Sequence, residues 1–293
     1  MLLTEKMQQP IFSTTEQIVI DYLIEEREKI TNKTIKEISS DTFVSPSILI
    51  RISNKLGYSG WTSFKKDFLH EVNYLDTHFQ KIDANYPFSK KDSLTKISNK
   101  IGTLAQETIS DTLHLLHHDD LHLATQLLDD ANKIKVFASN VNIYLAQDFV
   151  HKLNRLKKDI SIVSLDGEQL FEASNLEKDT LAILISYSGE NRTITSLLPI
   201  LKRNDVKILS ITNMGENSLS REATCSLKIS TREKLYSKIA SFSSHYSICF
   251  LLDVLYASLF SLDYDKNLAH TIALSQLHDP RTSHIEALKE KEG

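Results

Sequence analysis

Hydroxyl side chains and a glycine follow a long apolar run near the middle of the chain. Residues 180–191 read Thr-Leu-Ala-Ile-Leu-Ile-Ser-Tyr-Ser-Gly-Glu-Asn, which is typical of a strand buried on both faces that ends at a loop. Apolar residues then recur at helical spacing over 191–203, so Ser186, Ser188 and Gly189 lie where a strand passes into a helix. In a parallel sheet ligands usually bind at this edge. Hydroxyls and free N–H groups at a helix N-terminus predict a site for an anion, most simply a phosphate.

The second segment with recognisable chemistry is a predicted helix that begins after Ser45. Ser45 can cap the helix, Pro46 suits its first position and Gly57 ends it. The inward positions are apolar, and the opposite side presents small, polar and basic residues: Ser47, Ile50, Arg51, Asn54 and Lys55. A short helix expected over 34–40 precedes it. Two short helices in this order are typical of a helix-turn-helix, whose second helix enters the major groove of DNA.

The charges near this helix also favour DNA. Between Phe43 and Lys66 there are four basic residues and no Asp or Glu, while Glu25, Glu26 and Glu28 lie on a first helix expected over 13–28. We expect that helix to turn its acidic side away from the phosphates and to bury Ile18, Val19, Tyr22 and Leu23. Residues 1–78 are slightly acidic as a unit, and the whole chain has a net charge of −4. DNA affinity must therefore come from geometry and a dimer rather than from bulk charge.

The rest of the chain predicts an α/β domain. Pro87 and several polar residues mark a linker over 84–92 between a first domain, 1–83, and two connecting helices over 93–132. From residue 133 to 262, five apolar strands alternate with helices, with strands expected over 134–138, 160–163, 180–185, 206–212 and 225–229. This pattern predicts a doubly wound five-stranded parallel sheet with helices on both faces. The last helix is expected over 237–262, followed by a C-terminal helical tail over 263–293.

Several classes of site are disfavoured. The two cysteines, Cys225 and Cys249, lie too far apart for a disulfide framework or a metal motif and indicate a reduced cytoplasmic setting. The histidines and aspartates over 114–122 lack the spacing of known metal sites, so we expect no metal and no cofactor. The N-terminus lacks a secretion signal, and the most apolar helix, 248–260, contains Asp253 and is too short for a bilayer. We therefore expect no membrane partner.

The first domain resembles the DNA-binding domain of RpiR/MurR-type transcriptional regulators. Residues Ser45 to Arg51 and the run Lys55-Leu-Gly-Tyr-Ser-Gly-Trp-Thr-Ser-Phe-Lys65 carry the resemblance. One departure is Ile48, where the family usually has Thr, and we expect it to affect packing rather than specificity. The alternative is a protein-docking module. The resemblance implies that the residues that contact DNA are Ser45, Ser47, Ile50, Arg51, Asn54, Lys55, Ser59, Lys65 and Lys66.

The second domain resembles a sugar isomerase (SIS) domain, which RpiR-type regulators join to such a head. The resemblance rests on residues 185–190, Ile211-Thr212 and the segment 244–255, and it implies that a phosphosugar binds here. The family has Gly-x-Gly-x-Ser after the first strand, where this chain reads Ala138-Ser-Asn-Val-Asn142. Asn191 and His245 likewise replace Thr and Arg. The implied ligand-binding residues are Asn140, Asn142, Ser186, Ser188, Gly189, Glu190, Asn191, Ser244 and His245.

Together these patterns predict a cytoplasmic regulator of carbohydrate metabolism that senses a phosphorylated sugar. We expect a homodimer, or a dimer of dimers, that binds a palindromic double-stranded DNA operator, with the sugar phosphate shifting the placement of the two heads. An enzyme is the first alternative, with an isomerase or lyase acid and base among Asp166, Glu168, Glu190 and His245. A regulator whose pocket has lost phosphosugar binding is the second.

Overall fold

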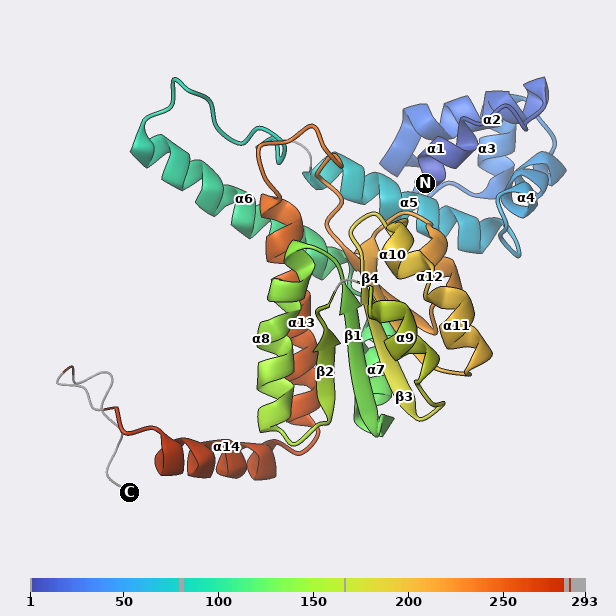
Figure 1. Cartoon of the computed structure of the whole chain (residues 1–293). Coiled ribbons are helices and arrows are strands. Elements are labelled where there is room, and N and C mark those ends of the chain that lie inside the picture. Colours follow the sequence, from blue (N-terminus) through green and yellow to red (C-terminus); the bar gives the residue numbers. More distant parts are fainter. Residues whose placement is uncertain (1, 79–81, 166, 282–284, 286–293) are drawn as a thin grey trace.

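The computed structural model describes residues 2–78, 82–165, 167–281 and 285. A helical head occupies residues 2–78, and an α/β domain begins at residue 133 (Figure 1). The head lies over one end of the α/β domain, and the C-terminal helix projects from the opposite end (Figure 1). An N-terminal helix-turn-helix head joined to a doubly wound domain is the fold that the sequence predicts.

The head contains five α-helices and a 3₁₀ turn within the described residues. Ser13 and Thr34 cap their helices through the reciprocal bonds of a capping box, with Glu16 and Glu37 as the returning side chains. Pro46 opens the recognition helix as expected. The elements are α1 (Leu3–Met7), α2 (Thr14–Glu26), the 3₁₀ turn η1 (Arg27–Ile30), α3 (Ile35–Thr42), α4 (Pro46–Lys55) and α5 (Trp61–His78).

The core of the head differs from the expectation at α2. Val19 and Leu23 are buried as predicted, but Ile20 is buried as well and Ile18 is 49% exposed. The inward face of α2 is therefore rotated by about a third of a turn from the one predicted, because α2 packs on both α3 and α4. The aromatic residues Trp61, Phe64 and Phe68 of α5 complete the core.

The α/β domain has a five-stranded sheet in which every pair of neighbouring strands is parallel. The strand order is β2-β1-β3-β4-β5, so the chain moves to one side from β1 to β2 and then to the other side from β3 onward. The strands are β1 (Lys133–Ala138), β2 (Ile160–Val163), β3 (Thr180–Ile185), β4 (Lys207–Asn213) and β5 (Cys225–Ile229). The reversal of direction lies between β1 and β3, at the centre of the sheet.

Each face of the sheet packs on its own helices. Alternate residues of β3 belong to different cores, since Leu181, Ile183 and Ile185 pack with α7, α8 and α13, while Ala182 and Leu184 pack with α9, α11 and α12. This burial of both faces explains the continuous apolar run in the sequence. The helices are α6 (Leu94–Leu115), α7 (His118–Asp130), α8 (Val141–Arg155), α9 (Gln169–Ser174), α10 (Arg192–Thr195), α11 (Leu198–Arg203), α12 (Ser218–Glu222) and α13 (Phe242–Ser261).

Two of the expected helices are wrong in their extent. The helix predicted over 191–203 is two short helices, α10 and α11, because Pro199 at the start of α11 lacks the N–H group that a continuous helix needs. The helix predicted from residue 237 begins only at Phe242. The residues before it, 231–241, form a loop at the carboxyl edge of the sheet.

The tail forms α14 (Tyr264–His278), which buries no residue in the chain. It leaves α13 at an angle of 107° and points away from the sheet (Figure 1). No single helix among the described residues is long and apolar enough to cross a membrane, and the bent pair α13–α14 passes on length and composition alone.

We predict that Phe137→Ala destabilises the α/β domain by about 3–5 kcal/mol, because this β1 ring is fully buried between the sheet and its helices. Urea unfolding followed by far-UV circular dichroism measures the loss. Trp61 is the only tryptophan and lies in the head, so its fluorescence reports the head separately. The control is Leu170→Ala at an exposed position of α9, and an equal loss in both variants would contradict the prediction.

Candidate functional site

The recognition helix α4 presents the side that the sequence predicts. Ser45, Ser47 and Ile50 are exposed, and the hydroxyls of Ser45 and Ser47 lie 2.7 Å apart at the start of the helix. Arg51, Asn54 and Lys55 continue the exposed side towards the end of the helix. Figure 1 places α4 on the outer part of the head, with α5 between it and the α/β domain. A DNA duplex can therefore approach α4 without meeting the second domain.

A carboxylate from α2 lies against the basic residues of α4, which the sequence did not predict. Glu16 accepts hydrogen bonds from Arg51 Nε at 2.9 Å and from Lys55 Nζ at 2.7 Å. The Glu16 side chain is 1% exposed, whereas those of Arg51 and Lys55 are 58% and 37% exposed. The acid-free segment is thus partly neutralised from outside. Glu16 holds both cations in place, and their exposed sides remain available to phosphates.

The other expected DNA contacts differ in their freedom. Ser59 and Lys66 are exposed. Lys65 instead donates to the carbonyl oxygens of Thr31 at 2.9 Å and Lys33 at 2.7 Å, and its partial burial lowers the pKa of Lys65. Lys65 therefore helps to fix the segment that follows η1.

A cavity of about 550 Å³ lies at the carboxyl edge of the sheet. Its walls come from the loops after β1 and β3, the loop 231–241 and the start of α13. These first two loops follow the neighbouring strands at which the sheet reverses direction, which is where doubly wound folds bind ligands. We call it the ligand cavity. Seven of the nine expected ligand residues line it: Asn140, Asn142, Ser186, Ser188, Asn191, Ser244 and His245.

The loop after β1 takes a backbone conformation that usually requires glycine. Asn140 has φ +55° and ψ −134°, a combination that is outside the left-handed helical region we expected for it. Asn191 donates to Ser139 Oγ at 3.2 Å and also caps α10 by accepting from the Ile194 N–H. The side chain that replaces the usual Thr therefore joins the two loops of the ligand cavity.

Gly189 and Glu190 do not line the ligand cavity, although the sequence placed them there. A Cβ at Gly189 would lie 2.0 Å from Asn217 Oδ1, so the chain can pass Asn217 only with glycine at this position. The Glu190 carboxylate accepts from Ser218 N and Ser218 Oγ, both at 2.7 Å. These two bonds lower the pKa of Glu190. Glu190 therefore holds the start of α12 in place.

The sequence did not identify Lys238 and Glu233 as part of the site. Lys238 lines the ligand cavity and pairs at 2.9 Å with the buried carboxylate of Glu233. Glu233 also accepts from the N–H and the hydroxyl of Ser244 at 3.0 and 2.9 Å. Lys238 was assigned to a helix that the structure replaces with a loop, so its position could not be deduced from helical spacing.

The interdomain linker is tied to this loop. The Asn85 side chain accepts from Lys234 N at 2.7 Å, and its main-chain oxygen accepts from Ile239 N at 2.9 Å. Asn85 is buried, and it also donates to the main-chain oxygen of Arg232 at 3.4 Å. The loop that carries Lys238 is thus held by the segment that leads to the head.

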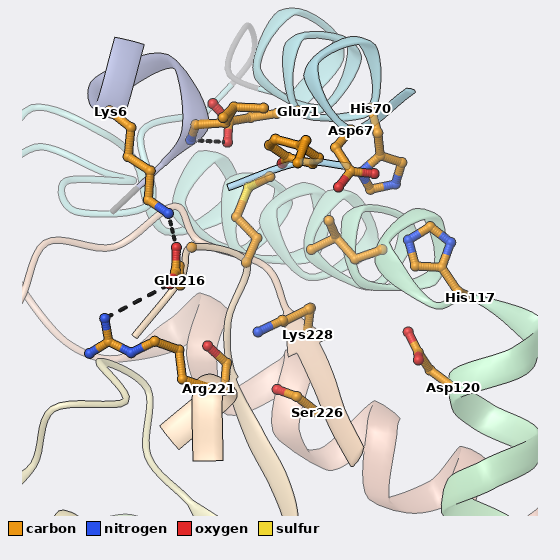
Figure 2. A pocket seen from close by; sticks show the side chains of 16 residues that line it. Lys6, Asp67, His70, Glu71, His117, Asp120, Glu216, Arg221, Ser226 and Lys228 are labelled. Atoms are coloured by element: carbon orange, nitrogen blue, oxygen red, sulfur yellow. Dashed lines mark hydrogen bonds and ion pairs between the residues drawn. The ribbon is translucent and has the colours of Figure 1, made fainter. Parts of the chain in front are cut away.

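A second cavity, of about 400 Å³, lies between the head and the α/β domain (Figure 2). Lys6 of α1 forms an ion pair with Glu216, which follows β4, and Arg221 of α12 lies 3.8 Å from the same carboxylate. On the other side His70 of α5 faces His117 at the start of α7, with ring centroids 4.9 Å apart. We call this the interdomain cavity. Polar and charged contacts at its edges hold the head, because its centre is not filled.

The proposed acid–base residues are not brought together. His245 lines the ligand cavity, but Glu190 binds Ser218, and Glu168 lies at the start of α9 outside the cavity lining. Asp166 lies outside the described residues. No group of three or more His, Cys, Asp or Glu side chains with a metal-binding arrangement occurs in the described part of the chain, which includes the histidines over 114–122.

We predict that acid weakens the head through Glu16. Burial alone would raise the pKa of Glu16, but the hydrogen bonds from Lys55 and Ser13 outweigh it and lower that pKa to about 2. The ionised form thus contributes roughly 3 kcal/mol above pH 4.5, which is lost as the pH falls towards 2. Glu16→Gln removes this contribution, so the difference in unfolding free energy from wild type, followed by Trp61 fluorescence, is largest at pH 7 and shrinks below pH 4.5.

The matched control is Glu37→Gln, because Glu37 has the same position in the capping box of α3 but is exposed. We expect a smaller effect there. Equal effects in the two variants at pH 7 would show that the cap, and not the ion pairs of Glu16, stabilises the head.

Two family models match most of the chain. The rpiR-family helix-turn-helix domain matches residues 1–73, and the SIS domain matches residues 127–258. Among curated relatives, the uncharacterized HTH-type transcriptional regulator YbbH of Bacillus subtilis is 25% identical over 251 residues, covering 86% of this chain and 87% of YbbH. The HTH-type transcriptional regulator RpiR of Escherichia coli K12 is 20% identical over 218 residues, covering 74% of this chain and 72% of RpiR.

Solved structures share the fold. The Vibrio vulnificus NanR protein complexed with ManNAc-6P aligns with a TM-score of 0.57 and 19% identity, covering 94% of this chain and 97% of that one. The protein c3406 of E. coli CFT073, in complex with a phosphosugar, aligns with a TM-score of 0.52 and 18% identity over 62% of this chain and all of the other. With an rpiR-family helix-turn-helix domain followed by a SIS domain, the chain belongs to the RpiR-type transcriptional regulators.

Proposed function

We propose that the ligand cavity binds a phosphorylated sugar and that binding changes the affinity of the head for its DNA operator. The chemistry of the cavity wall is the observation that carries this proposal. Hydroxyl and amide groups line the cavity together with the ammonium group of Lys238, and none of the described residues that line it carries a carboxylate. Such a wall favours an anion with many hydrogen-bonding groups.

The size and position of the cavity support the same ligand class. A volume of about 550 Å³ is within the usual range of small-molecule sites. Two proteins of the same fold, NanR and c3406, are named as complexes with phosphosugars, and the ligand of NanR is ManNAc-6P. In this chain we assign the phosphate to Ser186, Ser188 and Lys238, and the sugar hydroxyls to the amides of Asn140 and Asn142.

An enzymatic role is less well supported. Aldose–ketose isomerisation needs an acid and a base that reach the same sugar carbon. Glu190 is engaged with Ser218 outside the cavity, and the carboxylate of Glu233 is held by Lys238 and Ser244. We therefore propose a regulator that does not turn its ligand over. As a dimer, two heads would bind the two halves of a palindromic operator.

The loop after β3 offers a route from the ligand to the head. Asn213 donates to the main-chain oxygens of Tyr187 and Ser188 at 2.9 and 3.0 Å, and Glu190 holds Ser218. The segment between Asn213 and Ser218 carries Glu216, which pairs with Lys6 of the head. A ligand that moves the loop 186–191 thus moves the segment on which the head rests.

We predict that Lys238→Gln weakens the binding of ManNAc-6P, or of whichever phosphosugar in a panel binds the wild type, about tenfold or more, because it removes the cation that faces the phosphate. Isothermal titration calorimetry with the full-length protein measures the change, and the unphosphorylated sugars should not bind. Ser174→Ala, at an exposed position of α9, is the control. A wild-type protein that binds none of a panel of sugar phosphates would refute the sensor proposal.

We predict that Glu190→Ala uncouples the two sites. The sugar phosphate should bind within about threefold of its wild-type affinity, but it should no longer change operator affinity, because the bonds to Ser218 are lost. Fluorescence anisotropy with operator DNA, with and without ligand, gives the coupling factor. Glu222→Ala is the matched control, since this α12 carboxylate pairs with Lys202 instead.

A charge exchange tests the contact with the head. Lys6→Glu and Glu216→Lys should each reduce the coupling, and the double variant should restore it, because it restores an ion pair of reversed polarity. Coupling that persists unchanged in Glu190→Ala and in both single variants would mean that the signal takes another route.

A further inference from the structure

The turn between α3 and α4 contains an aromatic residue in a backbone conformation that suits glycine. Phe43 has φ +55° and ψ +34°, which is the left-handed helical region. Its neighbours close a helix C-cap of the usual kind, because Val44 N donates to Ser39 O at 3.1 Å and Phe43 N donates to Ser40 O at 3.4 Å. Glycine or asparagine normally occupies this position, and a bulky side chain is rare there.

The ring of Phe43 is also 95% exposed, which is the highest value among the large apolar side chains of the described residues. The next residue, Val44, packs against the core of the head, so the turn itself is well placed. The Phe43 ring adds no packing to the folded chain that could offset its backbone strain. Both features lower stability, so stability of the isolated protein does not account for a phenylalanine here.

The location of Phe43 indicates a partner. It stands two residues before Ser45, which caps α4, and the N-terminal residues of a recognition helix are the ones that reach base edges in the major groove. The turn belongs to the outer part of the head, away from the α/β domain (Figure 1). An exposed ring at this end of α4 would meet the duplex when the helix enters the groove.

We propose that Phe43 is a DNA-contacting residue whose ring packs on an apolar part of the operator, such as a thymine methyl group or a deoxyribose. Apolar contacts of this kind discriminate between sequences, whereas lysine and arginine contacts to phosphates do not. Phe43 thus adds apolar recognition beside the hydroxyls of Ser45 and Ser47. This inference depends only on DNA binding by the head and not on the identity of the ligand.

Phe43→Gly separates this role from a structural one, because the two predict opposite signs. Glycine relieves the left-handed strain and removes no packing, so the melting temperature of the head should rise by about 4 °C, as followed by Trp61 fluorescence. Operator affinity of the full-length protein should fall about tenfold in the same variant. Affinity for a non-operator duplex, and the slope of log K against log salt concentration, should stay as in wild type because no phosphate contact is lost.

Phe43→Asn is a second variant that also tolerates a positive φ, and it should reproduce the loss of operator affinity. Ile18→Ala is the control, since Ile18 is an exposed apolar residue of the same head but lies on α2. It should leave operator affinity within twofold of wild type. Operator affinity that is unchanged in both Phe43 variants, or a melting temperature that falls in Phe43→Gly, would overturn the proposal.

Discussion

The parallel pairing of β1 with β3 is the constraint on which the ligand cavity depends. Ala138 lies opposite Ile185 in the register of these strands, so Ser139 and Ser186 leave the sheet side by side. Strand β2 pairs on the outer side of β1 and β4 pairs on the outer side of β3, so the two loops diverge and leave a crevice between them. The bond from Asn191 to Ser139 then fixes the distance between the two loops. A one-residue slip would exchange the two faces of the strand and move both serines.

Charge is arranged in a similar way in the two domains. In the head, the buried carboxylate of Glu16 binds Arg51 and Lys55 and orients them along α4. In the α/β domain, the buried carboxylate of Glu233 binds Lys238 and the start of α13. Each acid is largely inaccessible, while its cations reach the surface or the cavity. Both sites thus present preoriented positive charge, which costs less to organise when a phosphate arrives.

The strands and the junction with the recognition helix could be predicted from the sequence because their signals are local. A continuous apolar run such as Thr180–Ile185 is buried on both faces, and Ser45-Pro46 starts a helix whatever surrounds it. The orientation of Glu190 and the partner of Arg51 could not be predicted, since both depend on residues far away in the sequence, Ser218 and Glu16. The loop around Lys238 was missed because its composition allows a helix, whereas tertiary bonds to Asn85 hold it open.

The interdomain cavity bears on how a small ligand could act on DNA binding. An interface filled by apolar side chains would fix the head, and sub-ångström shifts of the loop 186–191 would be too weak to move it. Here the contact depends on one ion pair, a pair of histidine rings and other polar groups at the edge of a cavity of about 400 Å³ (Figure 2). Exposed ion pairs contribute at most about 1 kcal/mol each. The placement of the head is therefore held by a free energy comparable with the differential binding energy of a ligand, which is the condition under which a ligand can change it.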